Sequence, residues 1–253
     1  MKLLLDLGNT RLKWALWSDS AQWIAQGAVE WQEEATAVLV STWAALARPS
    51  DVVAASVADD LREAQVEAAI SRVFADRVRW VRTPASACGV RNAYAEPQRL
   101  GIDRFLAMVA ATANGQAPCV LAGVGTALTL DALSADGRHL GGLIAPGPQL
   151  MQRALLDATA RVRPELPGDI LELADNTADA VTSGCWQAAA ALIDRFAARM
   201  RPRLGGNPTL ILTGGDAPTL LPLLSMPATL VQDGVLRGLA VWASMHLATP
   251  PSV

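Results

Sequence analysis

Apolar and polar positions alternate along the first third of this 253-residue chain with the spacing of strands and then of helices. Strands are expected at residues 2–7, 12–17, 23–30, 52–56 and 78–81. Alanine-rich helices are expected at residues 33–47 and 59–75. This part of the chain therefore has the predicted order β-β-β-α-β-α-β.

The organisation of the first half is repeated in the second half, after a helix expected to begin near Leu106. Strands are expected at residues 119–122, 127–133, 140–144 and 209–212, and helices at 148–161, 177–201 and 234–246. Ala-Asp-Gly at 135–137 is a hairpin signal. Identity between the halves is too low for a sequence repeat, although residues 5–10 correspond to residues 122–127. The pattern predicts two α/β lobes, residues 1–115 and 116–253, joined near 113–118.

Each predicted lobe begins with a strand, a glycine turn and a hairpin. This is the organisation of the actin-like ATPase fold of acetate and sugar kinases, Hsp70 and actin, in which a nucleotide lies between the lobes. The chain has no Gly-x-x-x-x-Gly-Lys-Ser/Thr loop, and Gly123-x-Gly125-x-x-Leu128 lacks the last glycine of a dinucleotide fingerprint. A two-lobed phosphate clamp is the simpler interpretation of these turns.

Composition excludes several other classes of protein. A net charge of −3 with scattered Lys and Arg gives no electrostatic footprint for nucleic acid. The three cysteines have no zinc-ligand spacing and are expected to be small buried residues in a reducing compartment. The apolar run after Lys2 is too short for a secretory core, and no run reaches the length of a membrane span. A cytoplasmic protein without a membrane partner is expected.

Asp6-x-Gly8-Asn9-Thr10 places a carboxylate at the end of a strand, directly before a flexible turn. Such a turn can offer backbone N–H groups and a hydroxyl to phosphate oxygens, while the carboxylate can hold Mg²⁺. The alternative is an ordinary polar hairpin, because Gly-Asn is a common turn dipeptide. Lys13 is either a phosphate-binding charge or a surface lysine.

Asp103-Arg104 precedes an apolar helical stretch and also has two interpretations. Asp103 is either a helix cap that interacts with the helix dipole or a general base beside an anion-binding guanidinium. His139 and His246 are far apart and have no evident carboxylate partners, so core or solvent positions are favoured over a Ser/His triad. The eight tryptophans are expected to be packing residues.

Six motifs occur in a fixed order along the chain. They are Asp6-x-Gly8-Asn9-Thr10-x-x-Lys13, Tyr94-x-x-Pro97-x-x-Leu100-Gly101-x-Asp103-Arg104, Gly125-Thr126-Ala127-x-Thr129-x-Asp131, Gly141-Gly142-x-Ile144-x-Pro146-Gly147, Asn176-Thr177 with Ser183-Gly184, and Thr213-Gly214-Gly215. Together they closely resemble the type III pantothenate kinases, also called the Bvg accessory factor family. The resemblance extends from residue 6 to about residue 240, which is nearly the whole chain.

The resemblance implies ATP-dependent phosphorylation of the primary hydroxyl of pantothenate, which gives 4′-phosphopantothenate in the first step of coenzyme A biosynthesis. It implies ATP and Mg²⁺ as cofactors. Asp103 would be the base that accepts the hydroxyl proton, and Asp6 would help to bind the Mg²⁺ ion. The implied nucleotide-binding residues are Asp6, Leu7, Gly8, Asn9, Thr10, Arg11, Leu12, Lys13, Thr126, Gly214 and Gly215. The implied pantothenate-binding residues are Tyr94, Gly101, Ile102, Asp103, Arg104 and Thr177.

The resemblance also implies a homodimer with the substrate site at its interface and Thr177 supplied by the partner chain. One position departs from the family pattern. Many members carry an aspartate that helps to bind potassium where this chain has Gly123, which puts a K⁺ or NH₄⁺ site in doubt even though Asp131 lies nearby in sequence. Two other functions stay open at this point: a phosphatase or sugar kinase of the same fold, and a nucleotide-binding regulatory protein without turnover.

Overall fold

The computed structural model describes residues 1–159 and 167–247. The described chain divides into two compact units. The first unit contains Met1–Asn114 together with the helix that begins at Gly234, and the second unit contains Gly115–Asp233. The junction lies within the predicted segment 113–118. The C-terminal helix, however, packs with the first unit, whereas the sequence pattern assigns residues 116–253 to one second lobe.

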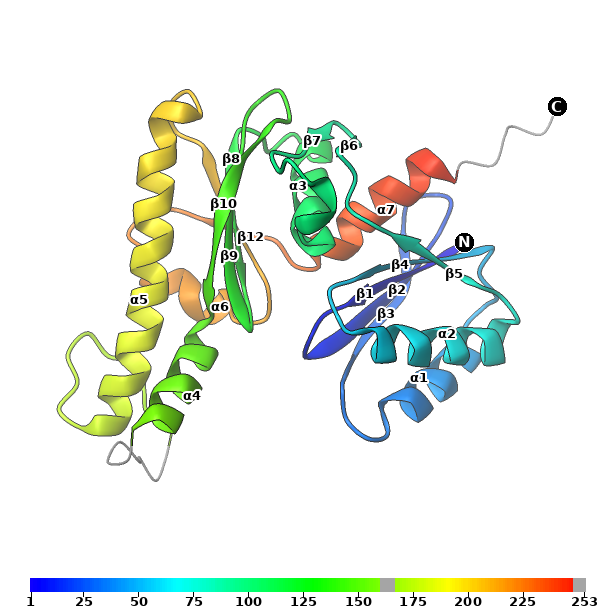
Figure 1. The fold of residues 1–253 in the computed structure, drawn as a ribbon, viewed down its shortest axis with the longest axis horizontal. Helices are drawn as coiled ribbons and strands as arrows, with labels where there is room; N and C mark the ends of the chain where they lie inside the picture. Colours follow the sequence, from blue (N-terminus) through cyan, green and yellow to red (C-terminus); the bar gives the residue numbers. More distant parts are fainter. Residues whose placement is uncertain (160–166, 248–253) are drawn as a thin grey trace. The chain divides into compact units, whose positions relative to one another are not determined.

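Five strands form the main sheet of the first unit, in the order β3-β2-β1-β4-β5 (Figure 1). They are β1 (Lys2–Leu7), β2 (Arg11–Trp17), β3 (Trp23–Glu30), β4 (Asp51–Ser56) and β5 (Val78–Val81). The first three strands form an antiparallel meander, and β4 and β5 run parallel to β1. The carboxyl ends of β1 and β4 therefore meet at the same edge of the sheet.

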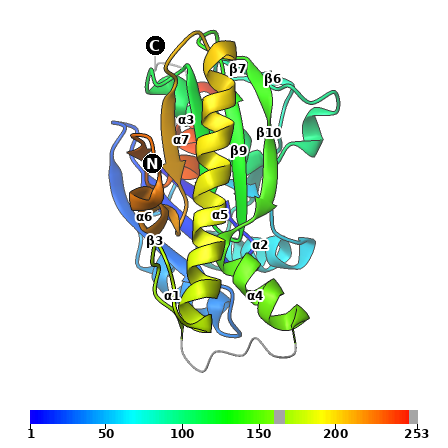
Figure 2. The same ribbon diagram turned by 90° about the vertical axis from the view of Figure 1, so that its left-hand side faces the viewer.

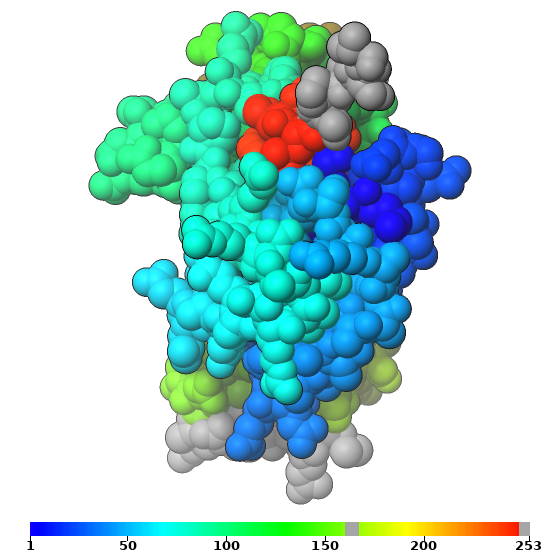
Figure 3. All heavy atoms as spheres, turned by 90° about the vertical axis from the view of Figure 1, so that its right-hand side faces the viewer, coloured from blue at the N-terminus to red at the C-terminus, as the bar shows by residue number. Residues whose placement is uncertain are grey.

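Alternate residues of β1 face different helical layers. Leu3, Leu5 and Leu7 lie in one core with residues of α1 (Ala35–Ala44) and α2 (Asp60–Phe74). Because side chains alternate along a strand, Leu4 and Asp6 face the opposite layer. That layer contains α3 (Ile102–Ala113) and α7 (Gly234–His246), which contact β4 and, for α7, β1. Figure 3 shows one face of this unit, on which blue to cyan residues of the first part of the chain lie beside the red residues of the C-terminal helix.

The helices α3 and α7 pack closely within the first unit. A Cβ at Gly238 of α7 would lie 1.9 Å from the carbonyl oxygen of Leu106 in α3, so only glycine permits this approach. α7 also buries Leu236 and Leu239. This packing explains why the C-terminal helix belongs to the first unit. α3 begins at Ile102, earlier than the start near Leu106 that the sequence pattern predicts.

The second unit contains a five-stranded sheet in the order β10-β9-β8-β11-β12. Its strands are β8 (Cys119–Val124), β9 (Ala127–Leu133), β10 (His139–Pro146), β11 (Thr209–Thr213) and β12 (Thr229–Leu230), and its helices are α4 (Pro148–Ala158), α5 (Thr177–Met200) and α6 (Ala217–Leu220). The predicted end of α4 at 161 lies outside the described residues. Figure 2 shows α4 beside the long helix α5, which buries Trp186 and Ile193 in the core of this unit.

The two main sheets have the same topology. Each contains an antiparallel meander followed by strands parallel to its first strand, so β1, β2, β3, β4 and β5 correspond to β8, β9, β10, β11 and β12. β1 and β8 even share one burial pattern, in which only the fifth residue is partly exposed. That residue is Asp6 in β1 and Gly123 in β8. The predicted duplication is therefore confirmed.

Some short elements have no counterpart in the predicted pattern. They are β6 (Ser86–Ala87), β7 (Val90–Arg91), β12, α6 and the 3₁₀ turns at Pro97–Arg99, Arg201–Arg203 and Leu221–Leu223. Within residues 1–159 and 167–247, no helix is both long and apolar enough to cross a bilayer.

Candidate active site

The turn between β1 and β2 lies at the carboxyl end of β1. The Gly8 N–H donates to the carbonyl oxygen of Arg11 at 3.0 Å, and Asn9 and Thr10 form the exposed tip. In the register of the two strands, Asp6 lies opposite Lys13. Residues directly opposite each other project from the same face of a sheet, so the carboxylate and the ammonium group flank the same side of the turn.

Asp103, Arg104, Tyr94 and Gly101 come together at the start of α3. The Arg104 N–H donates to Asp103 Oδ1 at 2.8 Å. Arg104 is only 5% exposed, and its Nη1 donates to the Tyr94 hydroxyl at 3.3 Å. A Cβ at Gly101 would lie 2.5 Å from Asp103 Oδ1, so the glycine leaves the space that this carboxylate occupies. The structure therefore brings together four of the predicted pantothenate-binding residues.

This cluster lies next to the edge of the sheet where β1 and β4 end. A Cβ at Gly101 would be 3.8 Å from Val57 Cγ1, and the Val57 N–H donates to the carbonyl oxygen of Leu7 at 3.0 Å. Asp6 faces the same layer as α3, the helix that carries Asp103. The predicted phosphate turn and the predicted base are thus on the same side of one sheet, at the edge where ligands of open α/β sheets bind.

The helix-cap interpretation of Asp103 is wrong in its strict form. The residue at the N-cap of α3 is Gly101, which has no side chain to cap the helix, and Asp103 lies inside the first turn. Its carboxylate still accepts the Arg104 N–H in the first turn, where a negative charge interacts favourably with the helix dipole. An ionised carboxylate is the form that a general base requires.

In the second unit, the glycine segments pack directly against one another. The Gly147 N–H donates to the carbonyl oxygen of Thr126 at 2.9 Å, and a Cβ at Gly147 would lie 1.8 Å from the carbonyl oxygen of Gly125. Gly214 has a φ of +104°, and a Cβ there would lie 2.1 Å from the carbonyl oxygen of Val124. These contacts hold the predicted Thr126 and Gly214-Gly215 segments together at the carboxyl ends of β8 and β11.

Two polar residues of this cluster were not predicted. The Asp216 N–H donates to the carbonyl oxygen of Val124 at 3.1 Å, and the Asp216 carboxylate accepts a hydrogen bond from Gln149 Nε2 at 2.8 Å. The pair therefore joins the start of α4 to the turn after β11. The position of Asp216 directly after Gly214-Gly215 was the available sequence signal.

Asp131, a predicted cation ligand, lies in a buried pair with His139. The two side chains are 3% and 0% exposed and are joined by a 2.8 Å hydrogen bond between Asp131 Oδ1 and His139 Nε2. Of the core and solvent positions that the sequence leaves open for His139, the structure shows the core position, and the prediction that it has no carboxylate partner is wrong. Among the described residues, no group of three or more His, Cys, Asp and Glu residues is arranged to hold a metal.

Other predicted residues have different surroundings. Leu7 and Leu12 are fully buried, with their side chains in the core beside α1 and α2, and Ile102 is also buried, so any ligand contact of the two leucines would use the backbone. Thr177 begins α5 in the second unit, where the side chain of Asn176 caps the helix by accepting the Asp179 N–H at 3.0 Å. Thr177 and Asp103 therefore belong to different units.

The cysteines show no feature of a reactive site. Burial raises the pKa of the Cys119 thiol to about 12, which keeps it protonated at neutral pH. Cys88 and Cys185 are only partly buried, so the prediction that all three cysteines are buried is wrong for these two.

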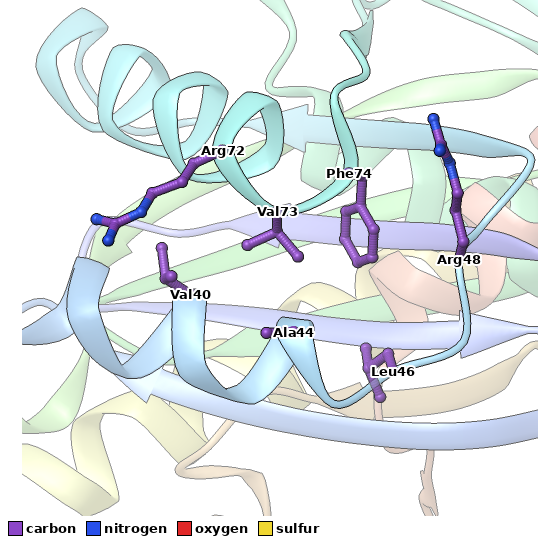
Figure 4. A pocket seen from close by; sticks show the side chains of 7 residues that line it. All are labelled: Val40, Ala44, Leu46, Arg48, Arg72, Val73 and Phe74. Carbon is purple, nitrogen blue, oxygen red and sulfur yellow. The ribbon is translucent and has the colours of Figure 1, made fainter.

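A hollow of about 400 Å³ lies between α1 and the end of α2 (Figure 4). Val40, Ala44, Leu46, Arg48, Arg72, Val73 and Phe74 line it. None of the predicted site residues is among them, so this hollow is separate from the candidate active site.

Solved structures of other proteins show the fold class of this protein. An acetate kinase from Porphyromonas gingivalis aligns with a TM-score of 0.51 at 12% identity, over 97% of this chain and 99% of that one. A Sinorhizobium meliloti protein assigned as a 2-dehydro-3-deoxygalactonokinase aligns with a TM-score of 0.59 at 14% identity, over 100% and 99%. The chain therefore has the actin-like ATPase fold, as its duplicated lobes predict.

Comparison of amino-acid sequences shows to which family of this fold the protein belongs. The family model described as type III pantothenate kinase matches residues 2–199. A type III pantothenate kinase from Xanthomonas oryzae pv. oryzae is 46% identical over 243 residues, which cover 95% of this chain and 96% of that protein. The chain belongs to the type III pantothenate kinase family.

Proposed function

We propose that this protein transfers the γ-phosphoryl group of ATP to the primary hydroxyl of pantothenate, with Asp103 as the general base. The observation that carries the proposal is the cluster at the start of α3. There the Asp103 carboxylate lies over Gly101, and the buried Arg104 contacts Tyr94. Family membership supports pantothenate as the substrate, and the cluster supplies groups suited to a hydroxyl and a carboxylate.

Each residue of the cluster has a distinct proposed role. Asp103 accepts the proton of the attacking hydroxyl, which makes the oxygen a better nucleophile. The Arg104 guanidinium binds the carboxylate of pantothenate, a pairing that its fixed donor geometry favours. Tyr94 holds the guanidinium in place through its hydroxyl. Because Arg104 is almost fully buried, a ligand can reach its guanidinium only by entering this cluster.

We propose nucleotide-binding residues in each of the two units, at the positions that the family resemblance implies. In the first unit the turn residues Gly8, Asn9 and Thr10 and the ammonium of Lys13 bind phosphate oxygens. In the second unit Thr126 binds phosphate, and Gly214 and Gly215 bind the nucleoside, with Gly147 allowing the tight packing around them. The carboxylate of Asp6 fits a hard cation, and Mg²⁺ held there would neutralise charge on the phosphates.

The direct test is the release of ADP when pantothenate is added to the protein with ATP and Mg²⁺. ADP release with pantothenate, and not with sugars or acetate, is the expected result. A protein that binds ATP but releases no ADP with any acceptor would instead be a nucleotide-binding regulatory protein. Release with a sugar alone would assign it to another kinase activity of this fold.

We expect Asp6→Asn to raise the Mg²⁺ concentration for half-maximal activity about tenfold, which corresponds to about 1.4 kcal/mol of binding free energy. The reason is that a neutral amide attracts a hard cation more weakly than a carboxylate. The matched control is Asp51→Asn, at the amino end of β4 in the same sheet, where Asp51 pairs with Arg79. An unchanged Mg²⁺ titration for Asp6→Asn would remove this residue from the metal site.

We also propose that a monovalent cation has little influence on this protein. A Cβ at Gly123 would lie 2.6 Å from Thr129 Oγ1, so the threonine hydroxyl fills the space in which a side chain at position 123 would begin. Asp131, the other carboxylate considered for this site, is hydrogen-bonded to His139.

Replacing K⁺ by Li⁺ at constant ionic strength should change activity by less than about twofold and leave the melting temperature unchanged, because a cation that binds the native state would raise it. The double variant Gly123→Asp, Thr129→Ala restores a carboxylate and the room for it, and its melting temperature should rise with K⁺. Stabilisation of the natural sequence by millimolar K⁺ would show that other ligands complete the site.

The proposed homodimer has support from apolar side chains on the second unit. Ile144 on the edge strand β10 is 65% exposed, and Leu173, just before α5, is 91% exposed. Leu143, Leu155 and Leu171 of the same unit are also exposed. An exposed edge strand with apolar side chains is a surface on which a second chain can pair.

A further inference from the structure

One tryptophan makes two hydrogen bonds to the predicted phosphate turn. The indole Nε1–H of Trp31 donates to the carbonyl oxygen of Gly8 at 2.8 Å. The backbone N–H of the same residue donates to the carbonyl oxygen of Thr10 at 3.1 Å. Trp31 follows directly after β3, the third strand of the antiparallel meander. The last residue of β3, Glu30, lies opposite Arg11 at the start of β2, so Trp31 lies beside the turn. The sequence predicts packing roles for the tryptophans, whereas Trp31 also forms hydrogen bonds with the turn.

The two hydrogen bonds determine where the N–H groups of the turn point. A trans peptide unit is planar, and its C=O and N–H groups point in opposite directions. When the Gly8 and Thr10 carbonyls face Trp31, the N–H groups of Asn9 and Arg11 in the same peptide units face away from it. Backbone N–H groups that point outward from a turn can bind an anion.

Trp31 is itself held in place from α2. The guanidinium carbon of Arg62 lies 5.4 Å from the centre of the Trp31 ring, within the range of a cation–π contact. Arg62 also forms an ion pair with Asp59, whose carboxylate caps α2 by accepting the Arg62 N–H at 2.9 Å. Trp31 also packs, partly buried, against the core of α1, α2 and the sheet. The ring is thus fixed on two sides before it meets the turn.

We propose that Trp31 is a positioning residue for the triphosphate of ATP. It holds the carbonyls of Gly8 and Thr10 so that the N–H groups of Asn9 and Arg11 point toward the phosphates. This inference depends on the proposed function, because it takes the Gly8–Arg11 turn as the phosphate site.

The test is Trp31→Phe, which removes the indole N–H but keeps an aromatic ring beneath Arg62 and the backbone N–H to Thr10. Loss of one neutral hydrogen bond predicts a three- to tenfold increase, roughly, in both the KM and the equilibrium dissociation constant for ATP. The KM for pantothenate should stay nearly unchanged, and the lost hydrogen bond should lower the melting temperature only slightly. A purely structural tryptophan would lower the melting temperature and leave both KM values unchanged.

The matched control is Trp23→Phe, at the opposite end of β3, where Trp23 packs against Trp17. This variant should leave both KM values unchanged. Equal ATP dissociation constants for the natural protein and Trp31→Phe, measured by calorimetry, would overturn the positioning role. If the natural protein released no ADP with pantothenate, the proposed function would fail, whereas the calorimetric comparison would still decide the role of Trp31.

Discussion

Asp103→Asn is expected to lower kcat for pantothenate phosphorylation by about 10²–10⁴-fold, the usual scale for the loss of a general base. Asparagine has nearly the same shape as aspartate but cannot accept the hydroxyl proton. The KM for ATP should change little, because the predicted nucleotide residues remain in place. Steady-state kinetics with pantothenate and ATP varied separately would measure both effects.

The melting temperature of Asp103→Asn shows whether this carboxylate acts in catalysis or only stabilises the start of its helix. Removing a negative charge from the first turn of a helix costs only about 0.3–1 kcal/mol. Asp60→Asn is the matched control, because Asp60 also lies in the first turn of its helix, α2, and has no proposed role. Both variants should show the same small loss in melting temperature, and only Asp103→Asn should lose turnover. A kcat within twofold of the natural value would remove Asp103 from the mechanism.

Gly101→Ala tests the same carboxylate without altering its chemistry. A methyl group at position 101 would lie 2.5 Å from Asp103 Oδ1, so the side chain of Asp103 must rotate. The displaced carboxylate remains ionisable, yet a displacement of about 1 Å can lower a rate by about 100-fold. Agreement between this variant and Asp103→Asn would show that the position of the carboxylate matters as well as its charge.

The strands and the duplication could be predicted because they depend on local pattern. Apolar runs of strand length followed by glycine turns indicate β1 and β8 directly, and the repeated order indicates two similar units. The residues around Gly101 and Asp103 could be recognised because their spacing is short and lies within one segment. These residues contact one another because they lie at the start of one helix. The sequence predicts that start to within a few residues.

Features that depend on distant packing could not be predicted. The assignment of α7 to the first unit depends on contact between Gly238 and Leu106, which are more than a hundred residues apart. The pair of Asp131 and His139 depends on the register of β9 and β10, which shifts between His139 and Gly141. The hydrogen bond from Trp31 to Gly8 depends on where β3 ends relative to the turn, which hydrophobic periodicity does not determine.

Mixing two inactive variants is expected to restore activity if each active site uses residues of both chains. Asp103→Asn removes the proposed base in the first unit, and Thr177→Lys places a bulky charge at the exposed start of α5 in the second unit. Each variant alone should be nearly inactive. In a hybrid dimer, one composite site would combine the natural Asp103 of one chain with the natural Thr177 of the other.

Random reassociation gives hybrids in about half of the dimers, and each hybrid has one intact site of two. The mixture should therefore recover about a quarter of the natural activity. The measurement is ADP release after the two variants are mixed, dissociated and reassociated, with each variant treated alone as the control. No recovery, despite hybrid dimers detected by mass, would place Thr177 and Asp103 of one site in the same chain, because every hybrid site would then carry one defect. A natural protein that is monomeric and fully active at assay concentration would contradict the composite site altogether.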